Sequence, residues 1–248
     1  MGKALITGAS SGIGAAVAQV LSEKGYEIIL VARRTDRLEA VAQTLKTKSE
    51  VVTADLGNKD TLAALVKNYP DIDILVNNAG FGVYGEFTET DFDKEDSMLD
   101  VNIRALHFLM KKYIPLMEKG GGRILNVASA AAFCSGPLLS SYYASKAYVL
   151  RLSNAVREEL RREKTPVSIT VLCPGPVETE FGRVSGSNLG KKTITARCAA
   201  EKAVNGMLKG KKTVVPSLIM KISRILSKIL PDALLVRTVY NLQKAKRR

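Results

Sequence analysis

The sequence predicts an α/β fold in which a doubly wound parallel sheet is covered by helices on both faces. Short apolar segments alternate with amphipathic segments along residues 3–172. The apolar segments lack a polar side, which indicates strands that are buried on both faces. A glycine-rich turn, residues 7–14, joins the first strand to the first helix. That combination is typical of a Rossmann-type fold.

Six apolar segments are predicted to be the strands of this sheet. They are rich in Ile, Leu and Val, and they are shorter than ordinary helices. The last of them is followed by the turn Pro174-Gly175-Pro176. In chain order the predicted strands comprise residues 3–8, 27–32, 50–54, 72–77, 122–128 and 167–172.

The segments between the strands are predicted to be helices because their apolar residues recur every three or four positions. Val17, Val20 and Leu21 share one side of the first helix, and Gly25 follows as its C-terminal cap. In chain order these helices comprise residues 13–24, 36–46, 60–68, 91–117 and 142–163.

Composition excludes several classes of protein. The 248 residues are 46% hydrophobic and 25% charged, which is typical of a globular chain and unlike a disordered or collagen-like one. The longest apolar runs are five residues, whereas a membrane-spanning helix needs ~20. The N-terminal residues do not resemble a signal peptide. We therefore expect a cytoplasmic protein.

The cysteine and histidine content predicts no metal site. Cys134, Cys173 and Cys198 form no C-x-x-C pair, so neither a disulfide framework nor a zinc site is indicated. The single histidine, His107, has no second ligand at metal-binding spacing, and a structural role is expected for it.

The basic charge is concentrated at the C-terminus. Residues 209–248 contain eleven Lys or Arg and one acidic residue, so they carry ten of the thirteen excess positive charges. We therefore divide the chain into a catalytic domain, 1–208, and a basic helical extension, 209–248. The body has an ordinary charge balance and no recognition motif, so nucleic acid is not expected as a partner.

The extension is predicted to contain two helices, residues 218–230 and 232–243, followed by a basic end. The first has Ile and Leu on one face and Lys221, Arg224 and Lys228 on another. It rests either on an anionic membrane surface or on the domain or a second subunit. Before it, residues 182–192 are rich in Gly, Ser and Lys and form either a plain surface connection or a substrate lid.

The glycine-rich turn has the position of a phosphate-binding loop. Gly8 permits the tight turn, Gly12 permits close approach of a pyrophosphate, and Gly14 permits close packing of the helix. Its spacing is G-x-x-x-G-x-G rather than G-x-G-x-x-G, so one more residue lies in the loop.

The end of the second strand predicts the cofactor. An NAD site places an acidic residue there to bind the ribose 2′-hydroxyl, but this chain has Arg33 and Arg34. A guanidinium group offers a charge-assisted fork to a 2′-phosphate. NADP(H) is therefore expected in preference to NAD(H), the alternative being two arginines that are merely solvated.

These motifs, over residues 3–182, resemble the short-chain dehydrogenase/reductase family. Besides the T-G-x-x-x-G-I-G loop they include Asp55-Leu56, Asn77-Asn78-Ala79-Gly80, Asn102, Ser129, Tyr142-x-x-x-Lys146 and Pro174-Gly175 with Thr179. The resemblance implies a catalytic set of Ser129, Tyr142, Lys146 and Asn102. It also implies these cofactor-binding residues: Gly8, Ser10, Ser11, Gly12, Ile13, Gly14, Arg33, Arg34, Asp55, Leu56, Asn78, Ala79, Gly80, Tyr142, Lys146, Pro174, Gly175, Val177 and Thr179.

The spacing of Tyr142 and Lys146 suits proton transfer. Lys146 lies one helical turn after Tyr142, on the same side, and its charge should lower the pKa of the phenol. Tyr142 would donate a proton to a carbonyl oxygen, or remove one from an alcohol, while Ser129 hydrogen-bonds the same oxygen. The family further implies that Asn102 holds a water molecule linking Lys146 to solvent, and that Lys146 binds the nicotinamide ribose.

These residues predict an NADPH-dependent oxidoreductase that interconverts a carbonyl and an alcohol. The alternative is an idle NADP sensor or a membrane-associated scaffold. The extension favours a lipophilic substrate, and the family implies a homodimer or homotetramer. Five residues are candidates either for the substrate pocket or for core packing: Phe81, Phe133, Leu139, Tyr143 and Phe181.

Overall fold

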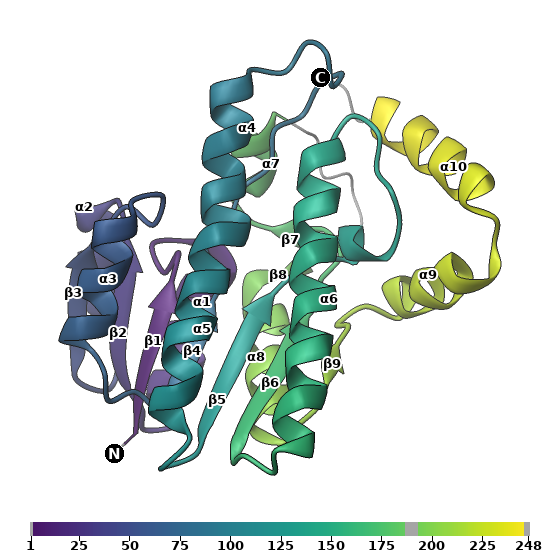
Figure 1. The fold of residues 1–248 in the computed structure, drawn as a ribbon. Helices are drawn as coiled ribbons and strands as arrows, with labels where there is room; N and C mark the ends of the chain where they lie inside the picture. Colours follow the sequence, from purple (N-terminus) through teal and green to yellow (C-terminus); the bar gives the residue numbers. More distant parts are fainter. Residues whose placement is uncertain (1, 187–192, 246–248) are drawn as a thin grey trace.

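The fold is known from a computed structural model, which describes residues 2–186 and 193–245. A seven-stranded sheet runs through its centre in the order β3-β2-β1-β4-β5-β6-β9 (Figure 1). All six neighbouring pairs are parallel. The strands are β1 (Lys3–Thr7), β2 (Glu27–Ala32), β3 (Ser49–Thr53), β4 (Ile74–Asn77), β5 (Gly122–Val127), β6 (Val167–Leu172) and β9 (Thr213–Val214). The predicted doubly wound parallel sheet is confirmed.

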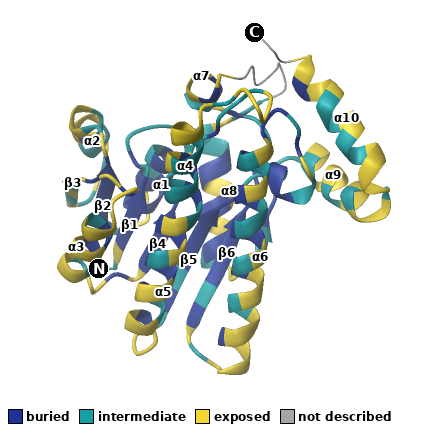
Figure 2. Ribbon diagram, turned by 45° about the horizontal axis from the view of Figure 1, so that its top comes forward, coloured by how far each residue is buried: buried dark blue, intermediate teal, exposed yellow. Residues whose placement is uncertain are grey.

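Helices cover both faces of the sheet, and each face has its own apolar core. One face packs against α3 (Lys59–Asn68), α5 (Leu106–Met117) and α6 (Ser140–Arg162). The other packs against α1 (Gly12–Glu23), α2 (Thr35–Ala42) and α8 (Ala196–Leu208). In β1, Leu5 points to the first core while Ala4 and Ile6 point to the second. In the inner strands, burial on both faces explains why the sequences are largely apolar (Figure 2).

The predicted long helix is divided into three parts. It consists of α4 (Phe92–Leu99), a π-helical segment (Asp100–Ala105) and α5. Asn102 lies in the π-helical segment and is buried. Hydrophobic periodicity does not reveal such a segment, because it changes the backbone hydrogen bonding over a few residues only.

Several elements after β6 are absent from the sequence prediction. They are α7 (Phe181–Ser185), α8 and three two-residue strands, β7 (Val177–Glu178), β8 (Ile194–Thr195) and β9. β9 pairs with β6, where Cys173 N donates to Val214 O at 2.8 Å. The sheet therefore continues into the segment that begins at residue 209. A two-residue strand is too short for a periodic signal.

The C-terminal segment forms two helices, α9 (Leu218–Ile229) and α10 (Asp232–Lys244), as predicted. They lie on the side of the sheet that ends with β9 (Figure 1). Within the part of the chain that the structure describes, no helix is long and apolar enough to cross a membrane. Residues 187–192 of the predicted loop and 246–248 of the predicted basic end lie outside the described residues.

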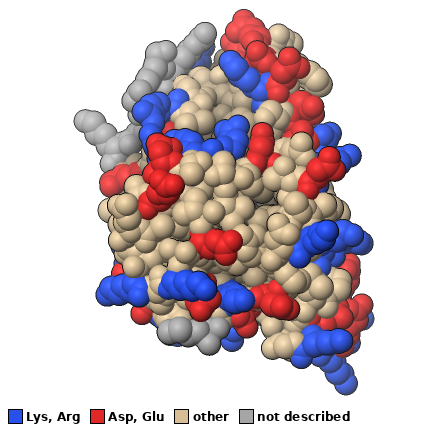
Figure 3. All heavy atoms as spheres, turned by 90° about the vertical axis from the view of Figure 1, so that its left-hand side faces the viewer, with Lys and Arg blue, Asp and Glu red and all other residues tan. Residues whose placement is uncertain are grey.

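Charged side chains are mixed on the side of the molecule opposite the extension. Figure 3 views the left-hand side of Figure 1, and Lys and Arg are interspersed there with Asp and Glu. This agrees with the sequence, in which most of the excess positive charge lies in residues 209–248.

Candidate active site

A cavity of about 1050 Å³ lies at the carboxyl ends of the strands. The strand order changes direction between β1 and β4, and ligands of open α/β sheets bind outside such a point. The cavity is lined by every predicted site residue except Gly14 and Asn102, which lie behind its wall. The structure thus brings the predicted nucleotide-binding and catalytic residues together around one space.

The three glycines of the loop stand where a side chain would not fit. Gly8 and Gly12 have φ of +65° and +58°, which L-residues rarely adopt. A Cβ on Gly14 would lie 2.4 Å from Gly8 O, so α1 packs directly against the loop. Asn78 fastens the loop to β4, since its Nδ2 donates to Thr7 O at 3.0 Å and to Gly8 O at 3.1 Å.

The start of α1 faces the cavity. Ser11 is its N-cap residue, but the Ser11 side chain accepts no hydrogen bond from the first turn of the helix. The first amides of a helix are a binding site for anions. The loop therefore fits the pyrophosphate of a dinucleotide.

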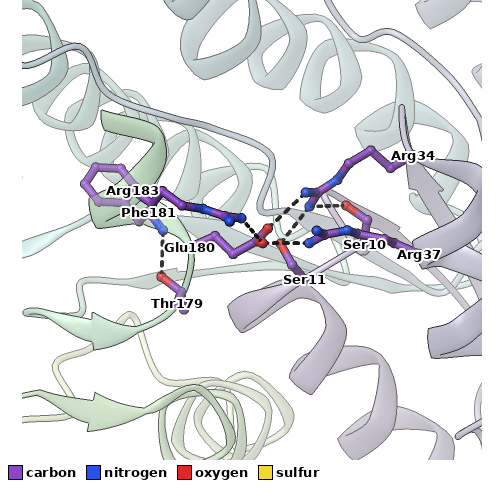
Figure 4. A network of polar contacts seen from close by, with 8 residues as sticks. All are labelled: Ser10, Ser11, Arg34, Arg37, Thr179, Glu180, Phe181 and Arg183. Carbon is purple, nitrogen blue, oxygen red and sulfur yellow. Dashed lines mark hydrogen bonds and ion pairs between the residues drawn. The ribbon is translucent and has the colours of Figure 1, made fainter. Parts of the chain in front are cut away.

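Of the two arginines after β2, only Arg34 is held in a network. Its Nη2 donates to the Oγ atoms of Ser10 and Ser11, both at 3.1 Å, while Arg33 lines the cavity as an exposed residue. Nη1 of Arg34 donates to Glu180 Oε2 at 3.0 Å, and Arg37 Nη1 donates to Glu180 Oε1 at 2.6 Å (Figure 4). Hydrogen bonds from Arg37 and Arg34 lower the pKa of the Glu180 carboxyl to about 2.

The sequence prediction did not include Arg37 or Glu180. Arg37 follows Arg34 by three positions and lies in the first turns of α2, so helical spacing could have suggested that both face the same side. Glu180 lies 146 residues from Arg34. No local pattern could have linked it to that side chain.

Ser129 and Tyr142 meet at the other end of the cavity. Ser129 Oγ accepts a hydrogen bond from Ala131 N at 3.1 Å, which fixes it at the start of a short 3₁₀ helix, Ala130–Phe133. Tyr142 lies in the first turn of α6 and is buried. Burial raises the pKa of its phenol to about 12, against the opposing effect of a hydrogen bond with Ser129.

Lys146 lies one turn further along α6. Its Nζ donates to Val127 O at 3.0 Å and is 5.8 Å from the centre of the Tyr142 ring. Burial lowers the pKa of this ammonium group to about 8. The expected lowering of the Tyr142 pKa is not found in this state of the protein. The desolvation of the phenol dominates, and the ammonium group bonds to a backbone carbonyl rather than to the phenol oxygen.

Asn102 supports this end of the cavity from behind. Its Oδ1 accepts from Phe81 N at 3.1 Å, and its Nδ2 donates to Phe81 O at 2.9 Å and to Ser145 Oγ at 3.0 Å. A Cβ on Gly80 would lie 2.7 Å from Asn102 Oδ1 and 3.1 Å from Lys146 Nζ. The π-helical segment thus ties the turn after β4 to α6.

The remaining wall is mostly apolar. Phe81, Phe133, Leu139, Tyr143 and Phe181 all line the cavity, and the Phe181 ring centre is 5.0 Å from that of Tyr142. The extension supplies the outer side, a role that the sequence analysis did not assign to it. Its apolar lining residues are Met220, Leu226, Leu230, Leu235, Val239 and Leu242.

One buried glutamine holds α10 on this wall. Gln243 Nε2 donates to Tyr143 Oη at 2.7 Å, and Gln243 O accepts from Tyr84 Oη at 2.8 Å. Both tyrosines line the cavity.

Cys134 lines this cavity, whereas Cys173, Cys198 and the histidine do not. All three cysteines are free, and burial raises the pKa of the Cys173 thiol to about 12. His107 Nδ1 lies 2.6 Å from Tyr148 Oη, outside the cavity. In the ranges 2–186 and 193–245, no group of three or more His, Cys, Asp or Glu is arranged to hold a metal ion.

Known proteins resemble this chain over most of its length. The family model described as short chain dehydrogenase matches residues 2–189. An uncharacterized oxidoreductase of Staphylococcus epidermidis is 37% identical over 207 residues, which cover 81% of this chain and 88% of that protein.

Solved structures share the fold. A short-chain dehydrogenase from Sphingobium yanoikuyae in complex with NADPH has a TM-score of 0.82 at 27% identity, covering 94% of this chain and 98% of that one. A short chain dehydrogenase/reductase from Burkholderia phymatum in complex with NAD has a TM-score of 0.82 at 23% identity, covering 91% and 92%.

Proposed function

The chain belongs to the short-chain dehydrogenase family of oxidoreductases, and on that premise we propose that it uses NADP(H) to interconvert a carbonyl and an alcohol, with Tyr142 as the acid and base. One observation carries the proposal. A single cavity joins the glycine-rich loop and Arg34 to Ser129, Tyr142 and Lys146. A nucleotide at one end and a carbonyl at the other would share that space.

The residues present fit a nicotinamide dinucleotide. Gly8, Gly12 and Gly14 form a cradle that side chains would fill, and the start of α1 faces it. Asp55 and Leu56 line the part of the cavity beside β2, where an adenine would lie. Bound there, the cofactor would supply or accept the hydride.

Tyr142 would transfer the proton to or from the substrate oxygen. Because burial keeps its pKa near 12, the phenol is protonated at neutral pH and can donate to a carbonyl oxygen as the carbon is reduced. Ser129 would hydrogen-bond the same oxygen and hold it beside the phenol. Lys146, whose charge is 5.8 Å from the ring, would stabilise the tyrosinate that remains.

The preference for NADP(H) rests on Arg34. Its guanidinium group lies against Ser10 and Ser11 at the loop, where it can bind a 2′-phosphate, and no acidic residue follows β2 directly. The two similar structures cited above hold NADPH and NAD respectively, so they do not decide between the cofactors.

The substrate is proposed to be apolar. The wall beside Tyr142 consists of aromatic and aliphatic side chains, and α9 and α10 extend it outward. An apolar wall favours binding of a long or bulky hydrocarbon group, because the group is removed from water.

The outer face of α9 is proposed to rest on an anionic membrane surface. Leu218, Ile222, Ile225 and Ile229 are 70%, 51%, 58% and 72% exposed, so this stripe does not pack on the domain. Lys221 and Lys228 flank it on the same helix. Ile222→Ser with Ile225→Ser should abolish pelleting with anionic vesicles. If wild type does not pellet and the substitutions instead split a dimer, the stripe is a subunit interface.

The first experiment follows NADPH oxidation with aldehydes and ketones of increasing chain length, with NADH as the comparison. Turnover that rises with chain length and disappears in Tyr142→Phe would support the proposal. Tight NADPH binding without turnover across the panel would contradict it and favour a cofactor sensor.

A further inference from the structure

Glu180 lies between the two ends of the active site. It immediately precedes α7, and its carboxylate reaches the loop between β2 and α2. Three arginines surround this one carboxylate: Arg34 at 3.0 Å, Arg37 at 2.6 Å, and Arg183 from the same segment (Figure 4). Because three guanidinium groups face one carboxylate, the cluster has a net positive charge even with Glu180 in place.

Arg34 connects this cluster to the nucleotide loop. One of its terminal nitrogens donates to Glu180, and the other donates to Ser10 and Ser11. If the chain binds NADP(H) as proposed, the 2′-phosphate lies against this guanidinium group. The phosphate carries a charge of about −1.5 to −2 at neutral pH. A carboxylate on the same guanidinium group would repel it.

We propose that Glu180 is a specificity-determining residue that occupies the position of the 2′-phosphate until NADP(H), but not NAD(H), displaces it. This proposal rests on the proposed function, because it needs a nucleotide bound at Arg34. Arg37 is the second ligand that the phosphate gains on displacing Glu180.

The displacement reaches the substrate end of the cavity. Phe181 follows Glu180 directly, and its ring packs on that of Tyr142 with the centres 5.0 Å apart. Thr179 precedes Glu180, and a Cβ on Gly12 would lie 2.9 Å from Thr179 Cγ2. Since Thr179 is held against the phosphate loop, movement of Glu180 is passed to the residue that follows it, Phe181. The 2′-phosphate and the substrate are therefore coupled, and the coupling acts in both directions.

The test measures dissociation constants of NADPH and NADH from nucleotide fluorescence, for wild type, Glu180→Gln and Glu180→Ala. We expect both variants to bind NADPH about tenfold more tightly, because the competing carboxylate is gone, and NADH within about twofold of wild type. The probes 2′,5′-ADP and 5′-AMP should show the same difference. Glu178→Gln is the matched control, since Glu178 lies on the same segment and accepts from Thr193 Oγ1.

The outcomes separate this proposal from the cofactor preference. The wild-type NADPH to NADH ratio tests the preference, and the change in that ratio on substitution tests Glu180. If the variants bind NADPH less tightly, Glu180 orients the arginines and the proposal is overturned. If wild type prefers NADPH and the ratio does not change in the variants, the proposal is overturned while the preference stands. If only the variants prefer NADPH, the proposal stands and the wild-type preference fails.

A kinetic measurement tests the coupling. In wild type the KM for the carbonyl substrate should differ between NADPH and NADH, because Glu180 is displaced only with NADPH. In Glu180→Gln the two KM values should converge. A KM difference that persists in the variant would overturn the coupling to Phe181.

Discussion

Lys146→Met is expected to remove activity while changing how the stability of the protein depends on pH. The Lys146 side chain is buried, and that burial lowers the pKa of its ammonium group from 10.5 to about 8. In the unfolded chain the same group keeps its ordinary pKa, so between about pH 8 and 10.5 the unfolded state binds more protons than the folded state. The stability of wild type that comes from this group therefore rises with pH across that window.

The magnitude follows from the two pKa values. Their difference corresponds to about 3 kcal/mol of destabilisation at neutral pH. About 2.5 kcal/mol of this is recovered by pH 10, where the ammonium group is neutral in the folded protein and partly neutral in the unfolded one. Methionine cannot titrate and fills a similar volume, so the variant lacks this component. It also loses the hydrogen bond to Val127 O, but that loss does not depend strongly on pH.

Urea unfolding followed by circular dichroism suits a chain without tryptophan. The free energy of unfolding of the variant minus that of wild type should decrease by about 2.5 kcal/mol between pH 7 and pH 10. Lys67→Met, which removes an exposed lysine, controls for the loss of one positive charge. A difference that stays constant with pH would refute the argument that burial disfavours the charged form of Lys146.

Three further changes test other parts of the structure. Between pH 7 and pH 11, Tyr142→Phe should gain about 1 kcal/mol of stability relative to wild type, because the folded phenol has a pKa near 12 and the unfolded state ionises first; parallel stability curves would contradict this. Gly14→Ala should cost about 2 kcal/mol and weaken nucleotide binding, since its Cβ would lie 2.4 Å from Gly8 O, whereas Gly120→Ala meets nothing within 4 Å and should be neutral. Gln243→Leu should loosen α10 and make it sensitive to protease, because the hydrogen bond to Tyr143 Oη is lost; unchanged cleavage would show that apolar contacts alone hold the helix.

The sequence predicts the first two thirds of the fold well for a physical reason. Strands buried on both faces and helices with one apolar side leave strong periodic signals. The predicted strand 167–172 coincides with β6, and helix 142–163 differs from α6 by one or two residues at its ends. Between β6 and α9 the signals fail. There the strands β7, β8 and β9 have two residues each, and α8 was not predicted at all.

The candidate site likewise has some features that the sequence predicts and others that it does not. Residues that belong to a motif of fixed spacing, such as Tyr142 and Lys146, can be assigned from the sequence, because one helix fixes their relation. The pKa of Tyr142 cannot, since it depends on how deeply the phenol is buried and on where the Lys146 ammonium group bonds. The role of Glu180 cannot be predicted from the sequence either, because two of its arginine partners, Arg34 and Arg37, come from a segment distant along the chain.

The extension shows why one amphipathic pattern permits two interpretations. The periodicity of α9 identifies an apolar side but not what that side faces. In the structure its strongest apolar stripe, which includes Ile222 and Ile225, is exposed, while Met220 lines the cavity from another side of the same helix. Leu230, the C-cap residue of α9, also lines the cavity. A helix that packed by its most apolar side would have hidden that stripe on the domain. Because α9 instead keeps the stripe outward beside a cavity with an apolar wall, a surface that covers the stripe would also lie next to the substrate site. The identity of that surface and the choice of substrate are therefore linked through one helix.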